Sequence, residues 1–241
     1  MRIVSRKKRK LKENKDHTTY YNSKGEVIPS VTTVLKVIAK DSLINWANSL
    51  GWKRLSVSKE LNDASEIGTI AHNYIEALIM EDNITKHEIS KEINWMPERL
   101  SDKVYNSIES FEKWWDENKY DFEIIECEKE MTCEEYGGTI DIIAKYKGKP
   151  VILDIKTSKS FYFTMFLQLG AYAHMYKCKY GKYPSDVGII KVDKNSGKKA
   201  KLLWLSDLPN GDFDFYYISY KRALDLYMNL HILESDWRSI K

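Results

Sequence analysis

The sequence predicts an α/β protein with a mainly helical N-terminal half packed on an α/β core. Apolar residues recur at helical spacing through much of residues 17–120. Short apolar runs separated by turns dominate residues 121–241. No stretch rich in Pro, Gly or Ser divides the chain, so we expect one domain over residues 17–241.

The first half opens on an extended pair and continues as helices. Residues 18–35, TTYYNSKGEVIPSVTTVL, predict a strand, a turn and a second short strand. Pro29 blocks a helix before it, and Ser30 can cap a helix that begins there. Further helices are expected at residues 41–55, 61–80 and 101–117, each with an apolar stripe at helical period.

The second half changes to the pattern of strands. Three strands with short connections are expected first, at residues 121–133, 137–147 and 150–157. A helix follows at 162–178, then a hairpin from 186–194 and 199–206, and a closing helix at 212–240. This half would hold the central sheet.

Charge is concentrated at the N-terminus. The chain of 241 residues has a formal net charge of +3, yet residues 1–15 hold eight Lys or Arg and one acid. We expect a basic, flexible arm over residues 1–16, and a phosphate-binding arm is the alternative. No apolar run reaches the length of a membrane span, and the basic start lacks the apolar stretch of a secretory signal. A cytoplasmic protein that does not associate with membranes is therefore expected.

The three cysteines, Cys127, Cys133 and Cys178, are far apart in sequence and include no C-x-x-C pair. Their odd number argues against a disulfide framework. Three scattered thiols also fit poorly with a four-ligand zinc or iron–sulfur site. We expect ordinary reduced cysteines.

The hairpin expected from residues 137–157 carries charged residues inside an apolar pattern. With an even-numbered loop centred on Lys147 and Gly148, Asp141 and Asp154 would face each other with Cβ atoms about 5 Å apart. An odd-numbered loop would put them on opposite faces. Lys156 lies two residues after Asp154 and would share its face.

Two facing carboxylates repel each other, so the arrangement favours a hard divalent cation such as Mg²⁺ or Mn²⁺. Such a cation can activate water and brace a phosphate, and Lys156 could neutralise the charge that develops. These are the parts of a phosphodiester-hydrolysis site. A solvated Asp/Lys face on an edge hairpin explains the same residues and stays open at this point.

Four short motifs then occur in one order: GTIAH (68–72), GGTID (137–141), DIKTSK (154–159) and QLGAY (168–172). Together they resemble the PD-(D/E)XK nuclease superfamily in its RecB-type exonuclease branch. Residues 28–35, IPSVTTVL, are also similar to the lead-in of phage and mitochondrial genome-maintenance exonucleases. The resemblance implies a restriction-endonuclease-like core, in which a mixed central sheet is flanked by helices. Residues 17–120 would form a helical part and residues 121–241 the catalytic part.

The resemblance also implies roles for individual residues. Asp141 and Asp154 become ligands of Mg²⁺ or Mn²⁺, and Lys156 becomes the catalytic lysine. The main-chain carbonyl of Ile155 and the ring of His72 would complete the metal shell. Because the four cysteines of the iron–sulfur members are absent, no iron–sulfur cluster is expected.

Gln168 and Tyr172 lie one helical turn apart, on a face that in the family looks onto the catalytic strand and the DNA. Tyr172 could equally belong to the core. Thr157, Ser158 and Lys159 follow the active strand, where hydroxyls and an ammonium can hold phosphates.

Three further glutamates, Glu126, Glu128 and Glu76, complete the candidates. Glu126, Glu128 and Glu130 alternate, which predicts that they share one strand face. In the family a glutamate here often assists the metal, and Glu126 or Glu128 could do so; a solvated strand face is the alternative. Glu76 follows His72 by one turn and could orient its ring, or could simply be exposed.

The sequence therefore predicts a metal-dependent DNA nuclease, in first place an exonuclease on DNA ends or single strands in phage or bacterial recombination, repair or replication. DNA is the expected partner, and recombination or replication proteins are further candidates. A structure-selective endonuclease on the same core and a non-catalytic protein that binds DNA ends remain as alternatives.

Overall fold

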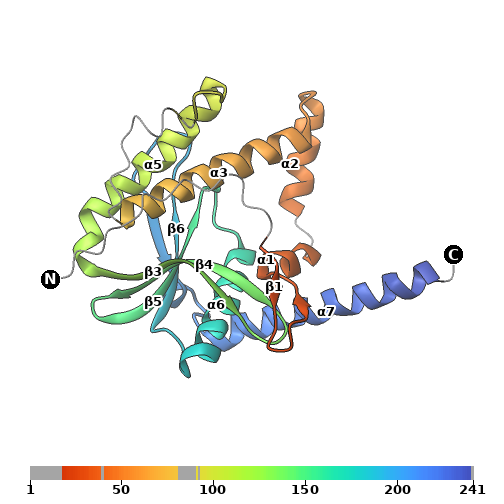
Figure 1. Cartoon of the computed structure of the whole chain (residues 1–241). Coiled ribbons are helices and arrows are strands. Elements are labelled where there is room, and N and C mark those ends of the chain that lie inside the picture. Colours follow the sequence, from red (N-terminus) through yellow and green to blue (C-terminus); the bar gives the residue numbers. More distant parts are fainter. Residues whose placement is uncertain (1–17, 39–40, 81–90, 92, 240–241) are drawn as a thin grey trace.

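The structure of the protein is a computed structural model, and it describes residues 18–38, 41–80, 91 and 93–239. The predicted basic arm at residues 1–16 lies outside these ranges. The first half is mainly helical, as predicted (Figure 1). Its elements are β1 (Tyr20–Tyr21), β2 (Val27–Ile28), α1 (Val31–Val34), the 3₁₀ helix η1 (Leu35–Val37), α2 (Asp41–Trp52), α3 (Val57–Ile79), α5 (Glu98–Asn118) and the 3₁₀ helix η2 (Lys119–Asp121).

The second half forms a five-stranded mixed sheet in the order β3-β4-β5-β6-β7. Strands β5 and β6 are parallel and are joined through α6, whereas the other neighbours are antiparallel. The elements are β3 (Phe122–Thr132), β4 (Gly137–Tyr146), β5 (Lys149–Lys156), α6 (Phe163–Tyr180), β6 (Asp186–Lys191), β7 (Lys201–Trp204), the 3₁₀ helix η3 (Leu205–Asp207) and α7 (Phe213–Ser239).

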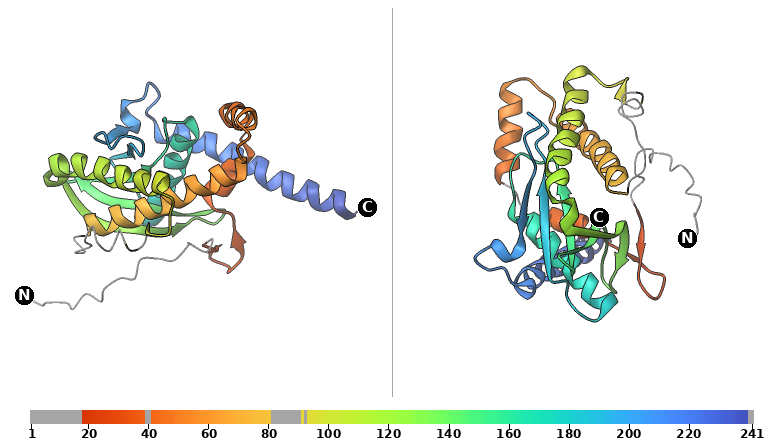
Figure 2. Two further views of the ribbon diagram at one scale, coloured as in Figure 1. Left: turned by 90° about the horizontal axis from the view of Figure 1, so that it is seen from above. Right: turned by 90° about the vertical axis from the view of Figure 1, so that its left-hand side faces the viewer.

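Helices cover both faces of the sheet, with α3 and α5 on one face and α6 and α7 on the other (Figures 1 and 2). The first face buries Ile142 and Leu153 against Ile75 and Phe111. The second face buries Ile152 and Val187 with the centre of α6 and with Tyr220 of α7. A sheet buried on both faces explains why β5 and β6 read as continuous apolar runs.

Side-chain caps fix where two helices begin. The hydroxyl of Ser30 accepts a hydrogen bond of 3.0 Å from the main-chain N–H of Thr33, so the predicted cap is confirmed. Ser56 caps α3 in the same way through Lys59. This second cap sets the start of the helix that carries His72.

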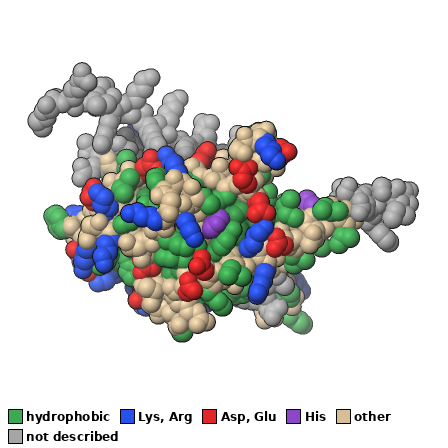
Figure 3. Space-filling view, turned by 90° about the horizontal axis from the view of Figure 1, so that it is seen from below, with side chains coloured by type: hydrophobic (Ala, Val, Ile, Leu, Met, Phe, Trp, Pro, Cys, Tyr) green, Lys and Arg blue, Asp and Glu red, His purple; other side chains and the backbone are tan. Residues whose placement is uncertain are grey.

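The last helix, α7, projects beyond the rest of the described structure (Figure 2). Hydrophobic side chains lie exposed along it, among them Leu226, Ile232 and Leu233 (Figure 3). Within the described residues no helix combines the length and the apolar character that a membrane span needs.

The β4–β5 hairpin has the even-loop register that the sequence predicts. Ile142 lies opposite Leu153, and the pairing continues outward to Tyr146 opposite Lys149. Lys147 and Gly148 form the two-residue turn with φ angles of 49° and 80°, as a type I′ turn requires. The next position along the ladder brings Asp141 level with Asp154.

Strand β3 is less regular than its alternating sequence predicts. The register of β3 on β4 shifts between Ile124 and Glu126, and Glu128 adopts a left-handed φ of 49°. As a result, Glu126 forms an ion pair of 2.9 Å with Lys129, while Glu130 is exposed. The prediction that the three glutamates share one face is wrong, because the bulge and the left-handed residue break the period of two.

Candidate active site

The candidate site lies where the end of β5 meets β3, β4 and the middle of α3. Asp154, near the end of β5, is 2% exposed, and its Oδ2 lies 2.6 Å from Nζ of Lys156. The two side chains share one face of the strand because they are two residues apart. The predicted pairing of an acid with an amine is therefore present as a close ion pair.

Burial determines the charge state of this pair. Loss of solvent raises the pKa of Asp154 to about 6, with Lys156 opposing the change and Asp141 adding to it. Burial on its own would lower the pKa of Lys156, but the charges of Asp154 and Asp141 raise it. Lys156 is thus a cation at neutral pH, and Asp154 is a carboxylate that burial has made costly to ionise.

Asp141 connects the two strands and the helix. Its Oδ2 accepts a hydrogen bond of 2.7 Å from the main-chain N–H of Ile155 and lies 3.5 Å from Nδ1 of His72. The side chain of Ile155 itself packs into the core beneath α3 and α5. The predicted metal role of the Ile155 carbonyl stays a prediction.

Glu128 joins Asp141 and His72. One donor atom from each of these three residues lies within 4.8 Å of the others, and all three side chains are half-buried. Glu128 is level with Asp141 on the β3–β4 ladder, because the pairs Cys127–Ile142 and Lys129–Ile140 bracket it. Its left-handed backbone accompanies this placement.

Strand β4 also changes its facing at this level. Ile140 packs beneath α6, whereas Ile142 packs beneath α3 and α5, although a regular strand would place them on one face. Both strands are therefore distorted beside Asp141. Local distortions of this kind are common at functional sites.

The donor set fits a divalent cation. Oδ2 of Asp154 is buried, and although Lys156 is close, no partner forms a hydrogen bond of good geometry with it. Asp141 and His72, whose charges act on Asp154, form a cluster with Glu128. Oxygen donors with one imidazole suit Mg²⁺ or Mn²⁺.

Gln168 and Tyr172 lie beneath the carboxylates rather than on the surface. They are 7% and 3% exposed, and Nε2 of Gln168 donates a hydrogen bond of 2.7 Å to the hydroxyl of Tyr172. Burial, followed by the charges of Asp154 and Asp141, raises the pKa of Tyr172, so its hydroxyl stays neutral. In the described structure this pair supports the site from below instead of offering a free surface to DNA.

The residues after β5 are more accessible. Thr157 and Ser158 are half-buried, Lys159 is exposed, and the hydroxyl of Ser158 donates to the carbonyl of Ser160. A methyl group at Gly68 of α3 would lie 3.5 Å from Oγ1 of Thr157. The glycine of the GTIAH motif thus faces the end of β5.

Of the three remaining glutamates, Glu128 joins the cluster of His72 and Asp141. Glu126 is held by Lys129, and its Oε2 is buried without a hydrogen-bond partner. Glu76 is half-buried one turn after His72 on α3. Its role in orienting His72 stays a prediction.

A comparison with known protein families identifies the class to which the chain belongs. A family model of the PD-(D/E)XK nuclease superfamily matches residues 47–222. This match spans more than half of the chain and includes all four motifs. The chain therefore belongs to the PD-(D/E)XK nuclease superfamily.

A crystal structure from Eubacterium rectale that carries the name "putative exonuclease" is similar to the chain, with 12% sequence identity and a TM-score of 0.44. The similarity covers 69% of this chain and 65% of that one, so the chain spans less than two thirds of that protein. Among curated proteins, no sequence matches the chain.

Proposed function

We propose that the protein is a Mg²⁺- or Mn²⁺-dependent deoxyribonuclease and that His72, Glu128, Asp141 and Asp154 hold the metal. The observation that carries this proposal is the convergence of three ligand side chains, within 4.8 Å, beside the buried Asp154–Lys156 pair. When bound, the cation supplies a Lewis acid for the scissile phosphate and a water of lowered pKa.

The other residues of this site would neutralise charge or hold the metal ligands in position. Lys156 is held as a cation beside Asp154, and its charge would offset the negative charge that builds up on the phosphate. Ile155 holds Asp141 in place through its main-chain N–H. The hydrogen bond between Gln168 and Tyr172 fixes the position of these two buried side chains beneath Asp154.

For the DNA, we propose contacts at the end of β5. Thr157, Ser158 and Lys159 are at least partly accessible there and carry groups that bind phosphate oxygens. Gln168 and Tyr172 are better suited to a positioning role, since both are buried.

Within the superfamily, we place the chain in the RecB-type branch, because the motif order that resembles this branch coincides with the site. We propose an exonuclease that acts on DNA ends or single strands, in recombination, repair or replication in the cytoplasm of a bacterium or a phage-infected cell. Residues 17–241 would act as one nuclease domain.

The test is digestion of linear DNA, labelled at either the 5′ or the 3′ end, with Mg²⁺, with Mn²⁺ or with EDTA. Cleavage should require the cation and should disappear in the Asp154→Asn and Lys156→Ala variants. Glu130→Gln is the matched control, because Glu130 is an exposed acid on β3 outside the cluster. Full activity of either site variant would refute the proposal.

Covalently closed circular single strands distinguish the two nuclease classes. An exonuclease leaves such circles intact while it degrades the linear form. Cleavage of the circles at the same rate would replace the exonuclease proposal with a structure-selective endonuclease.

A further inference from the structure

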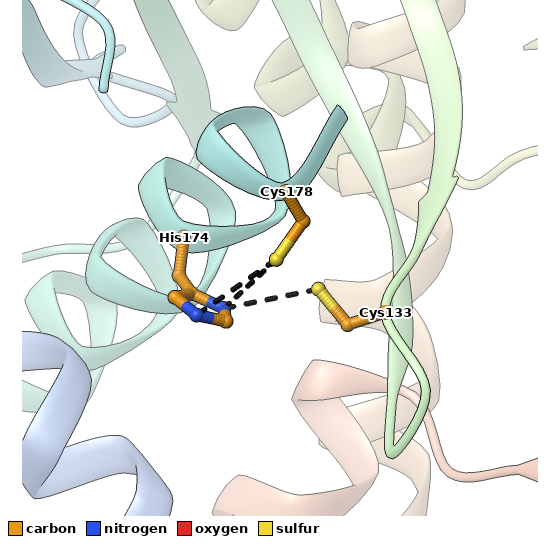
Figure 4. Close-up of side chains that lie close together, drawn as sticks. All are labelled: Cys133, His174 and Cys178. Atoms are coloured by element: carbon orange, nitrogen blue, oxygen red, sulfur yellow. Dashed lines mark hydrogen bonds between the residues drawn. The ribbon is translucent and has the colours of Figure 1, made fainter. Parts of the chain in front are cut away.

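A second group of metal-ligating side chains lies away from the candidate active site. Cys133 follows β3, and His174 and Cys178 lie one turn apart on α6 (Figure 4). One donor atom from each residue lies within 4.8 Å of the others. The group shares no residue with the cluster of His72, Glu128 and Asp141.

The distances suit a tetrahedral ion. Nδ1 of His174 lies 3.8 Å from Sγ of Cys133 and 3.7 Å from Sγ of Cys178. Zinc bonds of about 2.3 Å to sulfur and about 2.0 Å to nitrogen place such donors roughly 3.6 Å apart in a tetrahedron. The ring nitrogen is therefore spaced from each sulfur almost as it would be around one ion, and the two sulfurs lie within 4.8 Å of each other.

The ring of His174 is held in position by its neighbours. Tyr217 of α7 stacks on it, with ring centroids 3.7 Å apart and an angle of 7° between the planes. The hydroxyl of Tyr136 lies 2.9 Å from Nδ1 and also 3.4 Å from the carbonyl oxygen of Ala171. That hydroxyl can therefore turn to Ala171 when a metal takes Nδ1.

The chain segments that carry the donors are also fixed. The main-chain N–H of Cys133 donates a hydrogen bond of 2.8 Å to the carbonyl of Tyr136, which closes the turn between β3 and β4. His174 and Cys178 share one face of α6 because they are four residues apart. Since few side chains need to be ordered on binding, little entropy opposes it.

Metal can reach the group from solvent. A hollow of about 550 Å³ is lined by Cys133 and Cys178 together with Glu130, Thr132 and Glu134. Cys178 is exposed, while Cys133 and His174 are half-buried. The hollow leaves room for a water or an exogenous ligand in a fourth coordination position.

We propose that Cys133, His174 and Cys178 bind Zn²⁺ and so fasten the turn between β3 and β4 to α6. Two thiolates and an imidazole select zinc over the hard cations that the candidate active site suits. The turn leads into the strand that carries Asp141, and α6 carries Gln168 and Tyr172. Bound zinc would therefore brace two elements on which the nuclease site is built.

The experiment is a Co²⁺ titration of the full chain, purified with reductant and then freed of metal with a chelator. Cobalt bound by thiolate has a sulfur-to-metal charge-transfer band that oxygen and nitrogen ligands do not give. We expect this band to grow to one equivalent of Co²⁺ per chain and to vanish when Zn²⁺ is added. We also expect Zn²⁺ to raise the thermal midpoint by mass action.

Variants show which thiols bind. Cys133→Ser and Cys178→Ser should lose the band or need far more Co²⁺, since losing even a supporting residue of a metal site costs about 10–100-fold in affinity. The matched control is Cys127→Ala, which removes the third cysteine and should keep the band. Asp141→Asn should also keep it, so failure here is separate from failure of the proposed nuclease.

Three results would overturn the zinc site. The first is a wild-type chain with neither the band nor a Zn²⁺-dependent rise in thermal midpoint, a result that does not depend on how the variants fold. The second is an unchanged band in the folded Cys133→Ser variant. The third is a Cys133–Cys178 disulfide that forms equally fast with and without Zn²⁺, because bound metal should shield both sulfurs.

Discussion

Ile155 and Asp141 are joined by a hydrogen bond of 2.7 Å from the main-chain N–H of the first to Oδ2 of the second. The bond links β4 to β5 at the level of the candidate metal ligands, where regular main-chain pairing ends at Ile142 and Leu153. A side chain thus takes the place of a ladder bond. Asp141 is both a candidate ligand and a structural connection between the two strands.

This double role predicts different effects for two substitutions of Asp141. Asp141→Asn keeps an oxygen that can accept from Ile155 but removes the charge, so cleavage should be lost with little change in the free energy of unfolding. Asp141→Ala also leaves the N–H of Ile155 without its acceptor, which costs about 1–3 kcal/mol more. Urea unfolding in EDTA measures the difference, and equal stability of the two variants would contradict the structural role.

The backbone of Glu128 allows a test that separates charge from strain. Glu128 and Lys147 both have φ of 49°, but Lys147 is exposed at the tip of the β4–β5 turn. Glycine adopts this conformation without a steric cost but is more flexible when unfolded, so Glu128→Gly and Lys147→Gly should each stay within about 1 kcal/mol of wild-type stability. Only Glu128→Gly should lose metal-dependent cleavage. Normal cleavage in that variant would remove Glu128 from the metal site.

The hairpin register is the part of the site that the sequence specifies most directly. A two-residue turn centred on Lys147 and Gly148 fixes which residues of the two strands pair, and a slip by one residue would put Asp141 and Asp154 on opposite faces. Once the loop is taken as two residues, Asp141 and Asp154 can be matched from the sequence. The order of the four motifs adds His72, which lies on a helix distant in sequence.

Strand β3 shows where such prediction ends. The alternating pattern does not show which of Glu126, Glu128 and Glu130 is a metal ligand. In the structure, a bulge and one left-handed residue accompany the placement of Glu128 in the cluster with His72 and Asp141. Both distortions depend on how β3 packs against its neighbours, which a local pattern does not contain. The sequence does not indicate that Glu128 is left-handed, because this conformation is usually adopted by Gly or Asn.

The group around His174 escapes sequence-based prediction for a related reason. Cys133 and Cys178 are 45 positions apart, and only the docking of α6 against the turn after β3 brings their sulfurs together. The expectation of unconnected thiols follows from sequence spacing. One sequence feature does indicate a metal site. His174 and Cys178 are four residues apart within a predicted helix, and this spacing puts two ligands on one face.

The buried carboxyl of Asp154 predicts an unusual pH dependence of stability when metal is absent. Burial raises its pKa to about 6, whereas the unfolded chain releases this proton near pH 4. Between about pH 4 and pH 6, the folded state therefore binds a proton on Asp154 that the unfolded chain has released. The stabilisation by the protonated carboxyl of Asp154 is complete below about pH 4 and is lost as the pH rises through 6, with a size on the order of 3 kcal/mol.

Urea unfolding in EDTA between pH 4 and pH 7.5 measures this loss. Asp154→Asn is the reference, because the other ionisable groups are common to both proteins. The wild type should lose stability relative to this variant as the pH rises, and Mg²⁺ or Mn²⁺ should restore it near pH 7 by binding the folded state. A constant difference between the two proteins across this range would show that Asp154 ionises normally.

Gly138 allows a test of whether Tyr172 supports the candidate active site from beneath. A methyl group at this position would lie 2.9 Å from Cε1 of Tyr172, the residue that Gln168 holds by a hydrogen bond. Gly138→Ala should displace the ring, cost about 1–3 kcal/mol through overpacking and reduce cleavage. The control is Gly51→Ala on α2, where nothing lies within 4 Å of the added methyl group and helix propensity gains up to about 1 kcal/mol.

Urea unfolding and DNA digestion of the two alanine variants give the readout. Gly51→Ala should be at least as stable as the wild type and fully active. In the Gly138→Ala background, Tyr172→Phe should cost less than it does alone, because the hydrogen bond from Gln168 is already disturbed. Independent effects of the two changes would mean that Gly138 and Tyr172 do not act through this contact.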